Sequence, residues 1–234
     1  MRISEAAPRR FRNFSRTNIS DKERQRWAEE SRKRFEEEWQ AEIRQKKREQ
    51  LELALDKSGL RTAIQTLTFD SYVAEEPWQK RAKQICQRYA DNPHGWLLVS
   101  GPSGCGKTHL CTAVVGKMIE QEKPVWYMLY REEINKLKGI GVEPEERDKI
   151  MQFYKTAGIL YIDDLFKAGS SQADVRAMFE LIDYRYREKK QTIISTELSP
   201  DELKTVDEAL AGRMMQDASK VFISAEPGRN YRFK

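Results

Sequence analysis

The stretch Gly101-Pro102-Ser103-Gly104-Cys105-Gly106-Lys107-Thr108 decides the fold of this chain, because it fills every fixed position of the phosphate-binding loop pattern. Glycine tolerates the positive φ angles that turn successive backbone N–H groups inward, and the start of a helix adds positive potential. Lys107 is expected to reach the β- and γ-phosphate oxygens, and the Thr108 hydroxyl to hold Mg²⁺. Because apolar Trp96–Val99 precedes the loop and helix-compatible sequence follows it, a chance glycine-rich turn is disfavoured. The stretch predicts a nucleotide site.

A pair of carboxylates ends another apolar stretch. Ile159–Ile162 is followed by Asp163 and Asp164, an arrangement that looks like a Walker B motif. Asp163 is expected to complete the Mg²⁺ shell opposite Thr108, and Asp164 to polarise the attacking water. The alternative is that the pair only starts a turn. Together with the loop, the pair predicts an ATPase whose cofactors are ATP and Mg²⁺.

Strand and helix patterns alternate along the chain. Between successive strand candidates lie segments with helical periodicity, such as Val175, Met178, Phe179 and Ile182. Short strands without alternation are typical of a parallel sheet that is buried on both faces. We expect an α/β fold with a five-stranded parallel sheet flanked by helices. The five candidates are residues 96–100, 125–129, 159–163, 192–196 and 220–224.

Two further sequence features bear on helix boundaries and on cysteine chemistry. Ser199, Pro200 and Glu202 form a helix start, with a capping serine, a proline at the first helical position and an acidic residue three positions after the cap. The cysteines lack any CxxC pair, so neither a zinc site nor a disulfide framework is supported. We predict free thiols at Cys86, Cys105 and Cys111.

Charge divides the chain into two parts. Residues 1–57 hold 16 basic and 12 acidic residues, which leaves 26 and 25 of the total 42 and 37 for the remainder. Nearly all of the net charge of +5 therefore lies in the first quarter. We predict a charged helical arm at 1–57 and a nucleotide domain at 58–234. Because the sequence has neither a long apolar stretch nor the apolar core of a signal peptide, we expect a cytoplasmic protein without membrane contact.

The arm combines basic residues with aromatic ones. Phe11 and Phe14 lie in a basic, turn-rich stretch, and a capping box at Ser20 then begins one long helix or two, up to about Asp56. Its aromatic face either packs on the chain's own core or docks in a groove of a partner protein. The basic run Arg44–Arg48 either touches nucleic acid or forms a solvated surface. The face consists of Trp27, Phe35, Trp39 and Ile43.

Four short motifs carry a family resemblance from about Thr66 to the C-terminus. They are Thr68–Tyr72 (TFDSY), Gly106–Leu110 (GKTHL), Ile162–Leu165 (IDDL) and Ile193–Ser199 (IISTELS). Together they resemble the DnaC/DnaI-type bacterial helicase loaders and the related IstB transposition ATPases, a branch of the AAA+ ATPases. The resemblance implies an AAA+ P-loop domain with little or no lid domain, since only ten residues follow Ser224.

The resemblance also implies roles for single residues around the nucleotide. Phe69, Tyr72 and His109 are expected on its binding side. The terminal stretch Gly228–Arg232 (GRNYR) resembles the closing motif of the family, in which Arg232 or Arg229 is expected to approach the nucleotide or a neighbouring subunit, the alternative being a solvated basic tail.

Two positions bear on hydrolysis. Arg213 stands where the family keeps an arginine finger, which completes the site of a neighbouring subunit, so hydrolysis would need a homo-oligomer. The alternative is a helix-end cation. Glu197 stands where the family normally has Asn in its sensor. The added negative charge implies slow hydrolysis, or a sensor role for Thr196 instead.

The segment Arg131–Tyr154 corresponds to a helical insertion that in related proteins faces the channel of the oligomer. Its basic residues are candidate contacts for single-stranded DNA, although neighbouring glutamates offset their charge. The resulting hypothesis is ATP-dependent loading of a replicative hexameric DNA helicase onto single-stranded DNA. The alternatives are a transposition helper that binds duplex DNA and an adaptor that binds ATP without hydrolysis. The candidate DNA contacts are Arg131, Lys136 and Lys138.

Overall fold

The computed structural model describes residues 20–58, 60–167, 169–226 and 229–230. The predicted roles of Phe11, Phe14 and Arg232 fall outside these residues. The chain divides into two compact units, Met1–Lys46 and Lys47–Lys234. Among the described helices, none combines the length and the apolar character that a membrane crossing requires.

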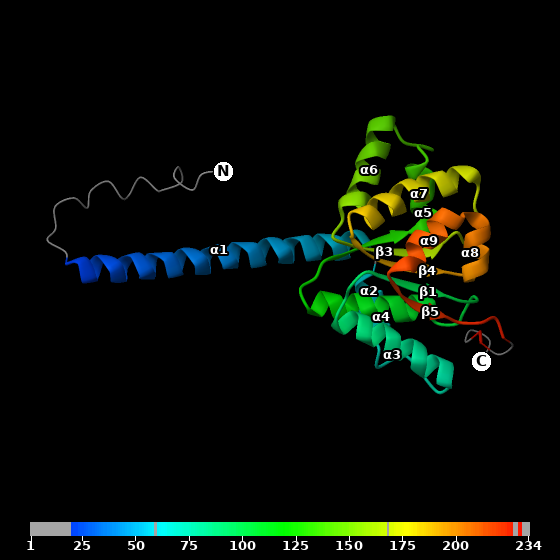
Figure 1. Ribbon diagram of the computed structural model, residues 1–234, viewed down its shortest axis with the longest axis horizontal. Helices are drawn as coiled ribbons and strands as arrows, with labels where there is room; N and C mark the ends of the chain where they lie inside the picture. The colour runs from blue at the N-terminus through cyan, green and yellow to red at the C-terminus, as the bar shows by residue number, and fades with distance from the viewer. Residues whose placement is uncertain (1–19, 59, 168, 227–228, 231–234) are drawn as a thin grey trace. The chain divides into compact units, whose positions relative to one another are not determined.

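The first unit contains most of one long helix, α1 (Asp21–Ser58), which begins directly after Ser20, as predicted (Figure 1). Of the two sequence alternatives, a single helix is observed. Three aromatic side chains are well exposed: Trp27 to 49%, Phe35 to 67% and Trp39 to 53%. The rings of Phe35 and Trp39 stack with centroids 6.5 Å apart. The aromatic face predicted from the helical spacing is therefore a surface feature of α1.

The second unit is built on a parallel sheet with strand order β2-β3-β4-β1-β5. The predicted five-stranded parallel sheet is confirmed. In such a sheet the carboxyl ends of all strands lie at one edge, where ligands of α/β proteins bind. The strands are β1 (Trp96–Ser100), β2 (Val125–Leu129), β3 (Ile159–Leu165), β4 (Gln191–Thr196) and β5 (Ala218–Phe222).

Three strands differ from their predicted bounds, and β4 differs least, because it begins at Gln191 rather than at Thr192. β5 begins at Ala218 rather than at Lys220, because it is an edge strand whose half-exposed first residues pair with β1 although they are not an apolar run. β3 continues past Asp163 to Leu165, and its pairing with β4 shifts register between Ile162 and Leu165. This irregularity lies at the predicted carboxylate pair, so the backbone changes direction there.

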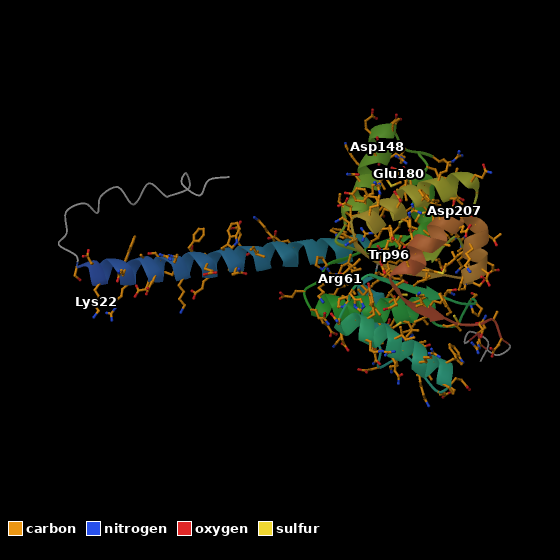
Figure 2. All side chains as sticks on the ribbon, in the orientation of Figure 1. Lys22, Arg61, Trp96, Asp148, Glu180 and Asp207 are labelled. Carbon is orange, nitrogen blue, oxygen red and sulfur yellow. The ribbon has the colours of Figure 1, made fainter. Side chains whose placement is uncertain are left out.

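Helices cover both faces of the sheet in three layers (Figure 1). One apolar cluster joins one face to α2–α4, and a second joins the other face to α5–α9. Figure 2 labels Trp96, which starts β1 and is buried in the second cluster. The helices of this unit are α2 (Arg61–Thr66), α3 (Pro77–Asp91), α4 (Lys107–Glu120), α5 (Tyr130–Leu137), α6 (Pro144–Thr156), α7 (Gln172–Arg187), α8 (Pro200–Val206) and α9 (Glu208–Gln216).

The two local predictions on caps and thiols are confirmed. The Ser199 hydroxyl accepts from the Glu202 amide, and the Glu202 carboxylate accepts from the Ser199 amide, at the start of α8. All three cysteines are free and buried. Burial raises the pKa of Cys86 to about 12 and also raises the pKa values of Cys105 and Cys111.

A fully buried guanidinium, Arg185 on α7, ties four elements together. Its Nε donates to the Thr192 hydroxyl on β4 at 2.9 Å. One terminal nitrogen donates to the carbonyls of Tyr154 and Ala157, at the end of α6, at 2.9 and 2.7 Å. The other donates to the carbonyl of Gly158, just before β3, and to that of Gln191, which starts β4. The carboxyl-terminal end of a helix favours a cation. Burial lowers the pKa of Arg185 to about 10, so it stays charged at neutral pH.

We predict that Arg185→Ala lowers the free energy of unfolding by about 3 kcal/mol or more, because it leaves several buried carbonyls without a donor and opens a cavity. The measurement is urea unfolding of the full chain. Arg176→Ala, an exposed arginine on the same helix, is the matched control and should stay within about 0.5 kcal/mol of the parent. Equal stability of the two variants would contradict the role given to the buried cation.

Candidate functional site

The predicted phosphate-binding loop connects β1 to α4, as expected. Gly104 and Gly106 have φ angles of +74° and +94°, which side chains other than glycine rarely adopt. A Cβ atom on Gly106 would lie 2.9 Å from the Tyr72 ring, and one on Gly104 would lie 1.9 Å from Oδ1 of Asn230. Both glycines are therefore required by backbone conformation and by close neighbours.

The two loop residues with predicted roles, Lys107 and Thr108, line the same cleft as the carboxylate pair. Lys107 is buried, and its ammonium donates to the Pro102 carbonyl at 2.9 Å. The Thr108 hydroxyl donates to Oδ1 of Asp163 at 3.4 Å. A hydroxyl and a carboxylate are the hard oxygen ligands that Mg²⁺ prefers, and Mg²⁺ commonly takes only one or two such ligands besides phosphates and water. Thr108 and Asp163 therefore fit the predicted Mg²⁺ site.

Asp163 is the centre of a buried hydrogen-bond network. Besides Thr108, the Tyr127 hydroxyl donates to its Oδ2 at 3.2 Å, and the Ser195 hydroxyl donates to its Oδ1. Ser195 also accepts from the Asp164 amide at 2.9 Å. Burial, and then the charge of Asp163, raise the pKa of Tyr127. Sequence reasoning missed Tyr127, in the middle of β2, and Ser195, near the carboxyl end of β4, although both strands neighbour β3.

Asp164 lies beside a cation that sequence reasoning also missed. The Lys167 ammonium is 2.8 Å from Oδ2 of Asp164 and 3.4 Å from Oε1 of Glu197. Its hydrogen bond with Asp164 is the main cause that raises the pKa of Lys167. The only available sequence signal was the position of this lysine, three residues after Asp164.

These groups surround one cleft of about 430 Å³. The cleft brings together the phosphate loop, the carboxylate pair and Glu197, as predicted. Thr196 is not among its lining residues. The Thr196 hydroxyl is buried, donates to the Leu165 carbonyl at 2.8 Å and accepts from the Leu198 amide. The lining residues are Leu67, Ser103, Gly104, Gly106, Lys107, Thr108, His109, Asp163, Asp164, Lys167 and Glu197.

The segment ahead of β1 contacts the phosphate loop and the start of α4 through Thr68 and Tyr72. The rings of Tyr72 and of His109, which lies on α4, meet edge to face at 5.1 Å, and Nε2 of His109 lies 2.9 Å from the Thr68 carbonyl. Both rings line a smaller cleft of about 160 Å³ beside Cys105. Phe69 lines a separate cleft between α3 and α4 that contains no phosphate-loop residue, and its predicted place on the binding side of the nucleotide stays a prediction.

Arg213 does not line the cleft of its own chain. On α9, its Nε donates to Asp183 at 2.8 Å and a terminal nitrogen donates to the Ala209 carbonyl at 2.9 Å. Its guanidinium also lies over the Phe179 ring at 4.7 Å. The predicted contribution to a neighbouring subunit's site stays a prediction.

The candidate DNA contacts lie in the predicted helical insertion, formed by α5 and α6 between β2 and β3. Arg131 is exposed, and Lys136 forms an ion pair with Glu133 at 2.8 Å. The Lys138 ammonium is held 2.6 Å from Asp174 with both side chains largely buried, and its role as a phosphate contact stays a prediction. Arg131 and Lys136 stay predictions.

The closing motif is described only at Arg229 and Asn230. Arg229 lies over the Trp78 ring at 5.1 Å and pairs with Glu226 at 2.6 Å. Asn230 contacts the position of Gly104, as noted above. The motif therefore reaches the phosphate loop through Asn230 in this structure.

The second unit is similar to a family of known proteins. The family described as the bacterial DnaA ATPase domain matches residues 64–219, more than half of the chain. The chain belongs to this family. It is accordingly an AAA+ ATPase domain protein related to replication initiation proteins.

Curated relatives are similar over part of their length. The chromosomal replication initiator protein DnaA of Francisella tularensis subsp. novicida is 27% identical over 150 residues, 62% of this chain and 30% of that protein. The uncharacterised protein YqaM of Bacillus subtilis is 29% identical over 174 residues, 68% of this chain and 55% of that protein. The chain thus spans about a third of the length of the DnaA initiators and about half of YqaM.

Solved structures share the fold. A crystal structure of the DnaC helicase loader matches with a TM-score of 0.60 and 22% identity, covering 69% of this chain and 98% of that one. AMPPCP-bound DnaA from Aquifex aeolicus matches with a TM-score of 0.56 and 20% identity, covering 72% of this chain and 53% of that one. At these identities the likeness concerns the fold alone.

We predict that Lys107→Ala weakens binding of a fluorescent ATP analogue at least about tenfold, because charge-assisted hydrogen bonds to phosphate are lost. Lys117→Ala is the matched control, since this lysine lies on the same helix and pairs with Glu120 at the surface. The control should bind like the parent. Undiminished binding by Lys107→Ala would refute the role of the loop lysine.

Proposed function

We propose that the protein loads a replicative hexameric DNA helicase onto single-stranded DNA, with ATP binding and hydrolysis as the switch. The observation that carries the proposal is the exposed aromatic face of α1 ahead of a DnaA-type ATPase unit. The fold likeness to the DnaC helicase loader, and to DnaI with a TM-score of 0.59 and 17% identity, supports it.

The arm supplies the partner contact. Trp27, Phe35 and Trp39 are large aromatic side chains, about half or more exposed, and charged residues surround them along the helix. Aromatic anchors dominate the binding energy at protein interfaces, and an amphipathic helix that lies in a groove is a recurring mode of recognition. The proposed groove belongs to the helicase.

The ATPase unit supplies the switch. Lys107 and a Mg²⁺ ion held by Thr108 and Asp163 would neutralise the phosphates, and Asp164 would orient the attacking water. Arg131 and Lys136 would contact the backbone of single-stranded DNA. The fold likeness to replication initiator DnaA bound to AMPPCP and single-stranded DNA, with a TM-score of 0.54 and 20% identity, supports that assignment.

The arm is tested in the full chain with the host's replicative helicase. We predict that alanine at Trp27, Phe35 and Trp39 together weakens capture of the helicase at least about tenfold, because the anchors of the interface are removed. The matched control replaces exposed polar residues on the opposite helix face, Glu29, Lys33 and Glu37, and should capture the helicase normally.

Capture is measured by pull-down with ATP present, beside nucleotide binding by each variant. Failure of the parent chain to capture the helicase would overturn the proposal and make binding of duplex DNA the next measurement. Equal capture by both triple variants would remove the arm from the interface.

Arg213 is tested through oligomer-dependent turnover. We predict that Arg213→Ala leaves ATP binding intact but lowers hydrolysis at least about hundredfold, since an arginine finger acts on the transition state. Arg187→Ala is the control, because Arg187 pairs with the same carboxylate, Asp183, at 3.0 Å. If both variants turn over alike, Arg213 is a structural cation of α9.

A further inference from the structure

The Lys167 ammonium connects two carboxylates of the nucleotide cleft, those of Asp164 and Glu197. The three side chains are 25%, 19% and 30% exposed, respectively, and all three line the cleft. An ion pair that is only partly reached by water is screened less than a surface pair. This arrangement is therefore a built part of the cleft rather than a solvated surface contact.

The backbone fixes Lys167 in this place. Asp164 and Phe166 have positive φ angles, 57° and 59°, and the Lys167 amide donates to the Asp164 carbonyl at 3.0 Å. The Phe166 side chain, next to the lysine, is buried against the Tyr130 ring with centroids 5.6 Å apart. Strained backbone that is held by surrounding packing is typical of functional sites. The tight turn returns the lysine toward the carboxylate three residues before it.

Charge explains why the cleft needs this cation. Three carboxylates line it, those of Asp163, Asp164 and Glu197, against the two ammonium groups of Lys107 and Lys167. Lys107 is directed at the phosphate loop through its bond to the Pro102 carbonyl. Without Lys167, Glu197 would present an uncompensated charge to a bound triphosphate, and like charges repel strongly where water is partly excluded.

We propose that Lys167 and Glu197 act as one unit, in which Lys167 is a positioning residue that neutralises Glu197 for nucleotide binding and orients the Asp164 carboxylate for hydrolysis. This inference rests on the ATP-binding part of the proposed function and is independent of the helicase.

The unit predicts a separation between binding and turnover. Glu197 opposes the phosphates only when Lys167 is absent, so its removal should restore binding to a chain that lacks the lysine. Orientation of Asp164 depends on the ammonium itself, so the same removal should not restore hydrolysis. If Lys167 had only a structural role, removal of Glu197 would not restore ATP binding while leaving ATP hydrolysis impaired.

The experiment compares Lys167→Ala, Glu197→Gln, their combination and Lys167→Arg in the full chain. The dissociation constant of a fluorescent ATP analogue and the single-turnover rate of ATP hydrolysis are measured for each. Lys155→Ala is the matched control, because Lys155 forms a similarly buried ion pair with Glu180, at 2.7 Å, outside the cleft. Glu180 is labelled in Figure 2.

We expect Lys167→Ala to weaken ATP binding about tenfold and the combined variant to bind within about threefold of the parent, since the repulsion is removed with Glu197. Both should hydrolyse ATP about tenfold more slowly or worse, and Lys167→Arg should retain both properties because it keeps the charge. The control should match the parent.

Two outcomes overturn the proposal. One is normal binding and hydrolysis by Lys167→Ala. The other is failure of Glu197→Gln to restore binding to the Lys167→Ala chain. A parent chain that does not bind ATP would instead refute the proposed function itself, so the two failures are distinguishable.

Discussion

A buried guanidinium at the amino edge of the sheet positions the strand on which the site depends. Arg185 bonds to carbonyls at the end of α6 and at the starts of β3 and β4, so it aligns the two central strands that deliver Asp163 and Ser195. The parallel register then places both side chains at the opposite edge, next to the phosphate loop. Four residues of β3, Ile159–Ile162, separate Gly158, which Arg185 contacts, from Asp163, and the hydrogen bonds of the sheet transmit the alignment.

Segments from both ends of the second unit pack against the phosphate loop. Thr68 and Tyr72 contact His109 and Gly106 on one side of the loop, and Asn230 contacts Gly104 on the other. A loop whose backbone is enclosed in this way loses little conformational freedom when a nucleotide arrives. Preorganisation of this kind favours binding because the entropy cost is met during folding.

The sequence predicted the parts of the site that lie within one continuous motif. The phosphate loop, the Asp163–Asp164 pair and the Ser199 cap depend on local spacing, and each is found where expected. Tyr127, Ser195 and Lys167 were missed because their roles arise from contacts between strands or from a strained turn, which no periodicity records. The sequence also did not reveal that Phe69 lines another cleft or that Asp174, distant in sequence, pairs with Lys138, because both depend on contacts between separate segments.

The burial of all three thiols has a practical consequence for labelling the protein at a chosen site. Maleimide chemistry requires an accessible thiolate, and burial both hides these sulfurs and raises their pKa values, to about 12 for Cys86. A cysteine introduced on an exposed position of α1 would therefore take up a fluorophore ahead of the native sulfurs at neutral pH. The parent sequence is in effect already a cysteine-light background, in which a single label can be placed at a chosen position of α1.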